Sequence, residues 1–194
     1  MSFLIYSIFK KMNIKIILIF GTLLLALIFA FSKPPVANPS QMSSEEAFYK
    51  MMEVVTHQRC VNCHPSGNAP KQGDESRVHD FGVVRDKVDC QTCHGTENNP
   101  YSGVPGAPHW ELAPESMKWE GLNKYEIAAS ILDTNRNGGK NHAELIEHLT
   151  EHELVLWAWN PGLDREPAPV NLEEYKEAVH LWFKNGAIIP PNKE

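Results

Sequence analysis

The chain has 194 residues and a net charge of −6, because 18 Lys and Arg stand against 24 Asp and Glu. This length suits one domain with a modest core, and the acidic balance argues against nucleic acid as a partner. All four cysteines fall within two short motifs, which lie between residues 60 and 94.

Residues 1–32 have the pattern of an export segment. They contain Lys10, Lys11 and Lys15 but no acid, and from Ile16 to Phe31 every residue is apolar, Gly or Thr. A basic flank before an apolar run of this length is typical of a signal peptide and is short for a full membrane span. The pattern predicts that the remainder of the chain is exported, which in a bacterium means a periplasmic protein.

Two fates of this segment remain open. Ala30-Phe31-Ser32 is a small-x-small cleavage site, whereas Pro34 and Pro35 after it favour an uncleaved N-terminal membrane anchor. Beyond residue 32 the chain has 15 Lys and Arg against 24 acids, a net charge of −9. This charge favours a redox partner protein with a basic docking surface, although it also fits ordinary acidic solubility.

Residues 33–42 form a linker with three prolines, and a domain over 43–194 follows. Ser43 and Glu46 fit a capping box at the start of a helix running to about Gln58. Its apolar positions recur at helical spacing at Phe48, Met51, Met52 and Val55.

Two pentapeptides then share the pattern C-x-x-C-H. They are Cys60-Val61-Asn62-Cys63-His64 and Cys90-Gln91-Thr92-Cys93-His94. This pattern is the attachment signature of c-type haem, in which both cysteines bond covalently to the porphyrin and the histidine binds the iron. The sequence therefore predicts two covalently bound haem c groups. The alternative is a zinc ribbon, which needs no histidine at the same offset after both pairs and is uncommon behind an export signal.

The connecting segments predict a mainly α, loop-rich fold organised around two haems. Gly and Pro interrupt residues 65–89 and 95–110, so we expect loops there. Three further helices are predicted, each from an Asn N-cap followed three residues later by Glu, at Asn123, Asn141 and Asn171. Gly138 and Gly186 suit helix ends, and no alternating pattern is long enough for a sheet.

Each iron needs a sixth ligand or has an open site, and this choice separates electron carriers from catalysts. His57, just ahead of the first motif, is one distal candidate, and we expect it to reach the iron of His94. His79 is the other, because the 14 residues after His64 allow it to cross the haem. Either one could instead be a surface histidine.

Other residues are weaker candidates for iron or metal binding. Met117 and His109 lie in proline-containing loops that could present a distal ligand. His148 and His152 have zinc-like i, i+4 spacing without a third partner, so we interpret them as ordinary helix residues. The stretch from Asp133 to Glu144 matches the calcium-loop pattern, but Lys140 and few charged ligands favour a plain turn between helices.

The chain resembles small dihaem c-type proteins labelled as isoquinoline 1-oxidoreductase subunits. The resemblance covers nearly the whole exported part and rests on His57 to Pro65, Cys90 to Gly95, Gly106 to Trp110, Arg136 to Gly139 and Trp159 to Gly162. It implies electron transfer, with a molybdenum hydroxylase as donor. The haem core, with His79 between the motifs, is also similar to the dihaem subunit of periplasmic nitrate reductase, and this similarity implies bis-histidine coordination.

The leading hypothesis is therefore a periplasmic electron-transfer protein with two six-coordinate irons and no substrate of its own. An enzyme of the dihaem peroxidase kind is the alternative, as is a haem sensor, and each of these would need one open iron site.

Overall fold

The computed structural model describes residues 42–192, so the export segment and residues 33–41 of the linker lie outside the described part. The longer helices are α3 (Ser44–Val55), α5 (Lys124–Leu132), α6 (His142–Thr150) and α8 (Leu172–Lys184). Shorter helical segments are α4 (Gln58–Val61), η1 (Asp80–Gly82), η2 (Cys90–Thr92), η3 (Glu115–Met117), α7 (Glu153–Leu156) and η4 (Trp157–Trp159). The predicted mainly α, loop-rich fold is confirmed for these residues, apart from one small hairpin.

The hairpin pairs β1 (Lys71–Gln72) with β2 (Arg77–Val78) in antiparallel register. Two residues per strand are too few to give an alternating sequence pattern, so the sequence predicts no sheet here. Asn62 donates a side-chain hydrogen bond of 2.9 Å to the Gly73 carbonyl at the hairpin turn. The hairpin is thereby attached to the helix that precedes the first motif histidine.

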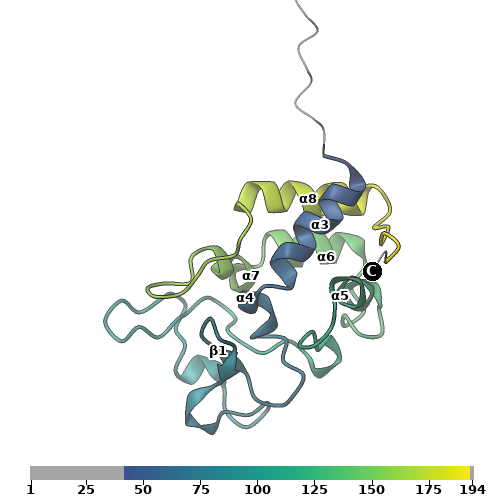
Figure 1. The fold of residues 1–194 in the computed structure, drawn as a ribbon. Helices are drawn as coiled ribbons and strands as arrows, with labels where there is room; N and C mark the ends of the chain where they lie inside the picture. The colour runs from purple at the N-terminus through teal and green to yellow at the C-terminus, as the bar shows by residue number, and fades with distance from the viewer. Residues whose placement is uncertain (1–41, 193–194) are drawn as a thin grey trace, which may run out of the picture. The chain divides into compact units, whose positions relative to one another are not determined.

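The core lies where α3 and α6 pack against α8 (Figure 1). Phe48 of α3 and Trp182 of α8 are completely buried, with ring centroids 6.1 Å apart. The four apolar positions predicted on the first helix, Phe48, Met51, Met52 and Val55, are all buried. Within residues 42–192, no helix is long and apolar enough to cross a membrane.

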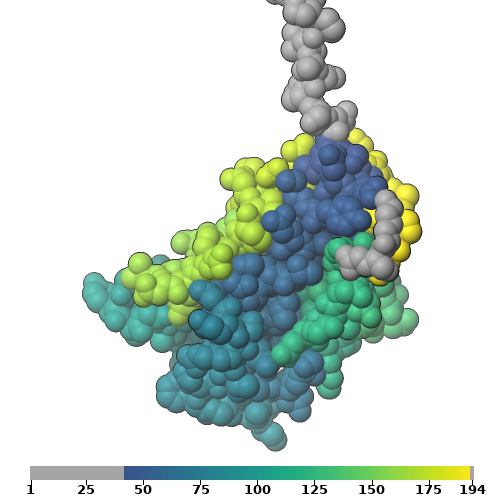
Figure 2. All heavy atoms as spheres, in the orientation of Figure 1, coloured from purple at the N-terminus to yellow at the C-terminus, as the bar shows by residue number. Residues whose placement is uncertain are grey.

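The first motif begins next to the core, since α4 contacts α3. The teal loop segments that follow lie at the end of the molecule away from α8 (Figures 1 and 2). The helix α3 ends at Val55, earlier than predicted, because Thr56 caps it and His57 adopts extended angles (φ −71°, ψ 151°). His57 is the N-cap of α4, so the first motif begins on a separate short helix. The chain therefore changes direction between α3 and the first motif.

Candidate functional site

The two motifs adopt the same local structure. In each, the amide of the histidine donates a hydrogen bond to the carbonyl of the first cysteine, at 3.2 Å for His64 to Cys60 and 3.0 Å for His94 to Cys90. One helical turn therefore places both cysteines and the histidine of a motif around a common point. None of the four cysteines forms a disulfide.

The thiols of the first motif are poor nucleophiles in this environment. Burial raises the pKa of Cys60 to about 12 and that of Cys63 to about 11. The neighbouring charge of Cys90 raises the Cys63 pKa further. Protonated thiols of this kind do not act as catalytic thiolates.

Both motif histidines have the same hydrogen-bonded tautomer. The Nδ1 atom of His64 lies 2.7 Å from the Met117 carbonyl oxygen, and that of His94 lies 2.7 Å from the Pro105 carbonyl oxygen. A carbonyl can only accept, so Nδ1 carries the proton and the lone pair of the neutral ring is on Nε2. This is the state in which an imidazole binds iron through Nε2.

A tryptophan stacks on each motif histidine. The Trp119 ring is 3.5 Å from the His64 ring with 7° between the planes, and the Trp110 ring is 4.5 Å from the His94 ring at 8°. Burial lowers the pKa of His64 to about 4 and also lowers the pKa of His94, so both rings are neutral at neutral pH. No local sequence pattern predicts these stacked pairs, because the residues of each pair are 55 and 16 positions apart.

Buried charge anchors the first motif. The side chain of Arg59, between His57 and Cys60, is 4% exposed and pairs with Asp74 of the hairpin turn. Its Nε donates a 2.7 Å hydrogen bond to the Glu166 carbonyl. The arginine therefore connects α4 to two distant loops.

The distal candidates differ in environment. The His79 ring centroid lies 6.0 Å from that of His94, and His79 Nδ1 is 2.7 Å from the Asp80 carbonyl, which leaves Nε2 with the lone pair. In contrast, His57 Nδ1 accepts a long hydrogen bond of 3.4 Å from the Arg59 amide, so its proton is on Nε2. The structure thus places His79 beside the second motif and gives His57 the opposite tautomer.

The weaker candidates are also located. Met117 is buried, and its sulfur accepts a 3.6 Å hydrogen bond from Ser130. The His109 ring lies 5.9 Å from His152, a residue that sequence spacing alone does not relate to it. Glu144, the last position of the calcium-loop pattern, accepts a 2.8 Å hydrogen bond from the Asn141 amide as part of a helix cap.

The surface beside the second motif contains a groove of about 550 Å³. Part of its lining is apolar or aromatic and lies next to Cys90, and the rest is charged or polar: Val83, Val84, Val88, Trp110 and Leu112 form the first part, and Arg85, Asp86, Lys87, Asp89, Gln91 and Glu111 form the second. Val84 and Val88 are substantially exposed, so apolar surface is available for burial there. Together with paired free cysteines and a histidine with its Nε2 lone pair available, this surface fits covalently bound haem c. No group of three metal-binding side chains of the zinc kind occurs within residues 42–192.

Comparison with known proteins gives one finding. Residues 32–95 match the family model described as cytochrome c554 and c-prime, a match that spans both C-x-x-C-H motifs. No curated protein and no solved structure matches the chain. The match supports a c-type cytochrome with covalently bound haem c that transfers electrons, and it supports neither the isoquinoline oxidoreductase nor the nitrate reductase resemblance by name.

Proposed function

We propose that the chain is a periplasmic dihaem electron-transfer protein. Cys60 and Cys63 would hold one haem with His64 as axial ligand, and the second motif would hold the other in the same way. The observation that carries this proposal is the repeated arrangement of His64 and His94, each with Nδ1 on a carbonyl and a ring stacked on tryptophan. Two motifs built alike at this level are expected to do the same chemistry.

His79 is the proposed sixth ligand of the iron that His94 binds. Two imidazoles that share one metal ion across its coordination sphere have ring centroids about 6 Å apart, since each metal–nitrogen bond is about 2 Å. The centroids of His79 and His94 are 6.0 Å apart. This pairing differs from the one that sequence spacing suggested, in which His57 served the iron of His94.

Bound haem c supplies an iron centre that is reversibly reduced by one electron, and bis-histidine ligation leaves no position for substrate. The protein side chains orient the ligands and exclude water. Consecutive residues contact both attachment sites, since the Ala113 amide donates a 3.1 Å hydrogen bond to the Cys63 carbonyl and the Leu112 backbone hydrogen-bonds Cys90. This arrangement supports transfer between two haems. The redox partner, a molybdenum hydroxylase if the isoquinoline resemblance holds, would dock through a basic surface against the acidic chain.

The test begins with a pyridine haemochrome count on the holoprotein. We expect two haems per chain, and one haem per chain after Cys60→Ala with Cys63→Ala or after Cys90→Ala with Cys93→Ala. A count of one in the unmodified protein would refute the dihaem assignment.

Near-infrared magnetic circular dichroism of the oxidised protein then tests the ligands. His79→Ala is expected to convert one of two low-spin bis-histidine centres to high spin. His180→Ala, at an exposed position of α8, is the matched control and is expected to change neither centre. A high-spin iron in the unmodified protein would instead favour the enzyme or sensor alternative.

A further inference from the structure

Two loops beside the second motif are joined into one surface. The first loop, residues 97–104, follows the motif, and the second loop, residues 160–166, follows η4. The Asn98 side chain donates a 2.8 Å hydrogen bond to the Asn160 carbonyl and so connects them. Figures 1 and 2 show the teal loop and the yellow-green loop side by side at the left edge of the molecule. We call these two loops the two-loop surface.

The two-loop surface exposes apolar side chains at its centre. Tyr101 is 98% exposed and Leu163 is 71% exposed. Each lies two residues ahead of a 2.7 Å hydrogen bond that Arg165 Nη2 donates to the Gly103 carbonyl, so the two side chains flank the junction of the loops. The first of them lies on a hydrogen-bonded turn, because Asn99 Oδ1 accepts from the Tyr101 amide at 2.9 Å. Large side chains presented in this way are typical of interface centres.

Negative charge surrounds this centre. Three exposed acids lie on the two loops, Glu97, Asp164 and Glu166. The one base in the same two ranges is Arg165, and it is engaged by the loop backbone, because it also donates to two carbonyls of its own loop at 3.2 Å and 3.4 Å. Three acids against one base therefore give the two-loop surface a negative rim.

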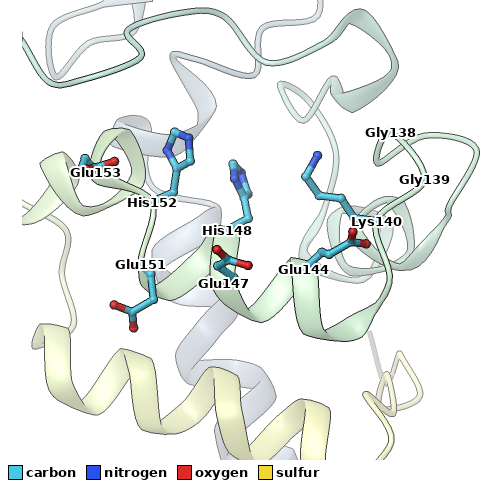
Figure 3. Close-up of a pocket in the computed structure, with 9 residues that line it drawn as sticks. All are labelled: Gly138, Gly139, Lys140, Glu144, Glu147, His148, Glu151, His152 and Glu153. Carbon is cyan, nitrogen blue, oxygen red and sulfur yellow. The ribbon is translucent and has the colours of Figure 1, made fainter.

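The segment that leads into the second loop is also acidic. Glu153 begins α7, and α7 with η4 connects it to residues 160–166. Figure 3 shows the Glu153 side chain at the opposite end of its pocket from Lys140, the lysine of that pocket. The acidic character therefore extends from the two-loop surface onto the neighbouring helix.

Aromatic contacts connect the two-loop surface to the ring of His94. Asn98 Oδ1 accepts a 2.8 Å hydrogen bond from Trp157 Nε1. The Trp157 ring lies 4.9 Å from the Trp110 ring, which in turn stacks on His94 at 4.5 Å. The Pro105 carbonyl, directly after the first loop, meets His94 at Nδ1. The two-loop surface therefore approaches this histidine from the nitrogen that does not bind iron.

We propose that the two-loop surface is the docking site of the redox partner, and that this partner is a protein with a basic surface around an apolar centre. The proposal rests on the dihaem function and names its docking site. An apolar centre within a charged rim is the composition of a protein interface, and opposite charge on the partner speeds the encounter. A docked ferric partner takes up one electron from the iron proposed at His94, which changes from ferrous to ferric, and no bond forms or breaks.

The test is stopped-flow oxidation of the reduced holoprotein by mitochondrial cytochrome c, a lysine-rich protein with a basic surface around its haem edge. Tyr101→Ser with Leu163→Ser is expected to lower the second-order rate constant roughly fivefold or more, because both central contacts are lost. Ile188→Ser, at an apolar position beyond α8 that is 65% exposed, is the matched control and should leave the rate constant unchanged. Oxidation by ferricyanide, which needs no docking surface, should be equal in all variants.

A second pair of substitutions tests the acidic rim. Glu97→Gln with Asp164→Asn is expected to lower the rate constant with cytochrome c roughly threefold at about 0.01 M salt, and this difference should shrink towards about 0.15 M. Asparagine is chosen because it tolerates the positive φ of 60° at Asp164. Glu177→Gln on α8 is the charge control. Acetylated cytochrome c, in which the lysines are neutral, should react with the rim variant and the unmodified protein at equal rates.

The outcomes separate the docking site from the function. Equal rate constants for Tyr101→Ser with Leu163→Ser and for Ile188→Ser would overturn the docking site, while two haems and two low-spin centres per chain would still support the dihaem function. A haem count below two in the unmodified protein would instead refute the function itself.

Discussion

At the scale of single residues, two backbone carbonyls determine which nitrogen of each motif histidine carries the proton. Neither carbonyl belongs to the motif, because Met117 lies 53 positions beyond His64 and Pro105 lies 11 beyond His94. The orientation of each proposed axial ligand therefore depends on the position at which a loop returns to its motif.

Gly106 allows the loop after the second motif to bring the Pro105 carbonyl to His94. A Cβ at this position would lie far inside van der Waals contact with the carbonyl oxygens of Gly95 and Glu97. Because these atoms are backbone, no side-chain rotation can relieve the clash, and Pro105 next to it would move. We expect Gly106→Ala to lower the free energy of unfolding by about 1–3 kcal/mol and to alter only the resonance of the haem proposed at His94.

The matched control is Gly67→Ala, where an added Cβ meets nothing within 4 Å. Urea unfolding measures the stability, and electron paramagnetic resonance measures each low-spin centre. Equal stability and equal spectra for the two variants would contradict this account.

Trp119 limits the rotation of the His64 ring. Its side chain is 5% exposed and its Nε1 has no hydrogen-bond partner among the described residues. We expect Trp119→Leu to lower the free energy of unfolding by about 1–3 kcal/mol, through lost stacking and an unfilled cavity. We also expect it to broaden the low-spin resonance of the haem proposed at His64. Trp119→Phe keeps an aromatic face and removes the unpaired N–H, so its loss should be smaller. A larger loss of unfolding free energy in Trp119→Phe than in Trp119→Leu would show that stacking is not the main contribution of Trp119 to stability.

At the scale of elements, helix starts were predictable because capping is local. The capping boxes at Ser43, Asn123 and Asn141 are present with their glutamates, and Asn171 caps α8. The predicted caps form where the cap residue and its Glu hydrogen-bond within their own turn. At Asn171 the box is incomplete, because Glu174 pairs with Lys50 of a distant helix, α3.

The stacked tryptophans and the position of His148 could not be predicted for the same reason. Their partners are brought together only when the loops fold back, and no periodicity records that event. The i, i+4 spacing of His148 and His152 was visible in the sequence, but only the fold shows which pocket the two rings enter.

Glu120 connects the loop after His64 to the segment after Trp119. Its carboxylate accepts hydrogen bonds from the Ser66 amide (2.9 Å) and the Ser66 hydroxyl (2.8 Å), and pairs with Lys71 at 3.0 Å. These contacts, the Ser66 amide first, lower the pKa of Glu120 below its ordinary value of 4.5. Since the folded state favours the ionised form, its contribution is present above pH 4.5 and is lost as the pH falls through the folded pKa.

We expect Glu120→Gln to lower the free energy of unfolding at pH 7 by about 1 kcal/mol or less, because the pair is partly solvated. The difference between Glu120→Gln and the unmodified protein should shrink as the pH falls from 4.5 through the lowered folded pKa of Glu120. Urea unfolding at pH 7 and at a series of pH values below 4.5 measures it. Glu177→Gln, at an exposed position of α8, is the control. A difference that stays constant over the whole acidic series would mean that the carboxylate charge is not the source of the effect.

At the scale of the whole molecule, the excess of acids should direct how reagents approach the haems. The net charge is −6 for the full chain and −9 for residues 33–194. Asp89 and Glu111 are exposed beside the second motif, and both contribute to the raised pKa of Cys90. With Asp86 they stand against Arg85 and Lys87 around the same groove, so acids outnumber bases there. A field of this sign raises the encounter rate with cations and lowers it with anions.

Stopped-flow reduction or oxidation of the holoprotein tests this field directly. Between 0.01 M and 0.15 M salt the screening length shortens from about 30 Å to about 8 Å. We expect the rate constant with hexaammineruthenium, a cation, to fall roughly tenfold over this range, and the rate constant with ferricyanide, an anion, to rise. Glu111→Gln should weaken the cation effect at low salt more than Glu177→Gln, which removes the same charge from the distant α8. If both variants behave alike, the acidic charge does not direct reagents to the second motif.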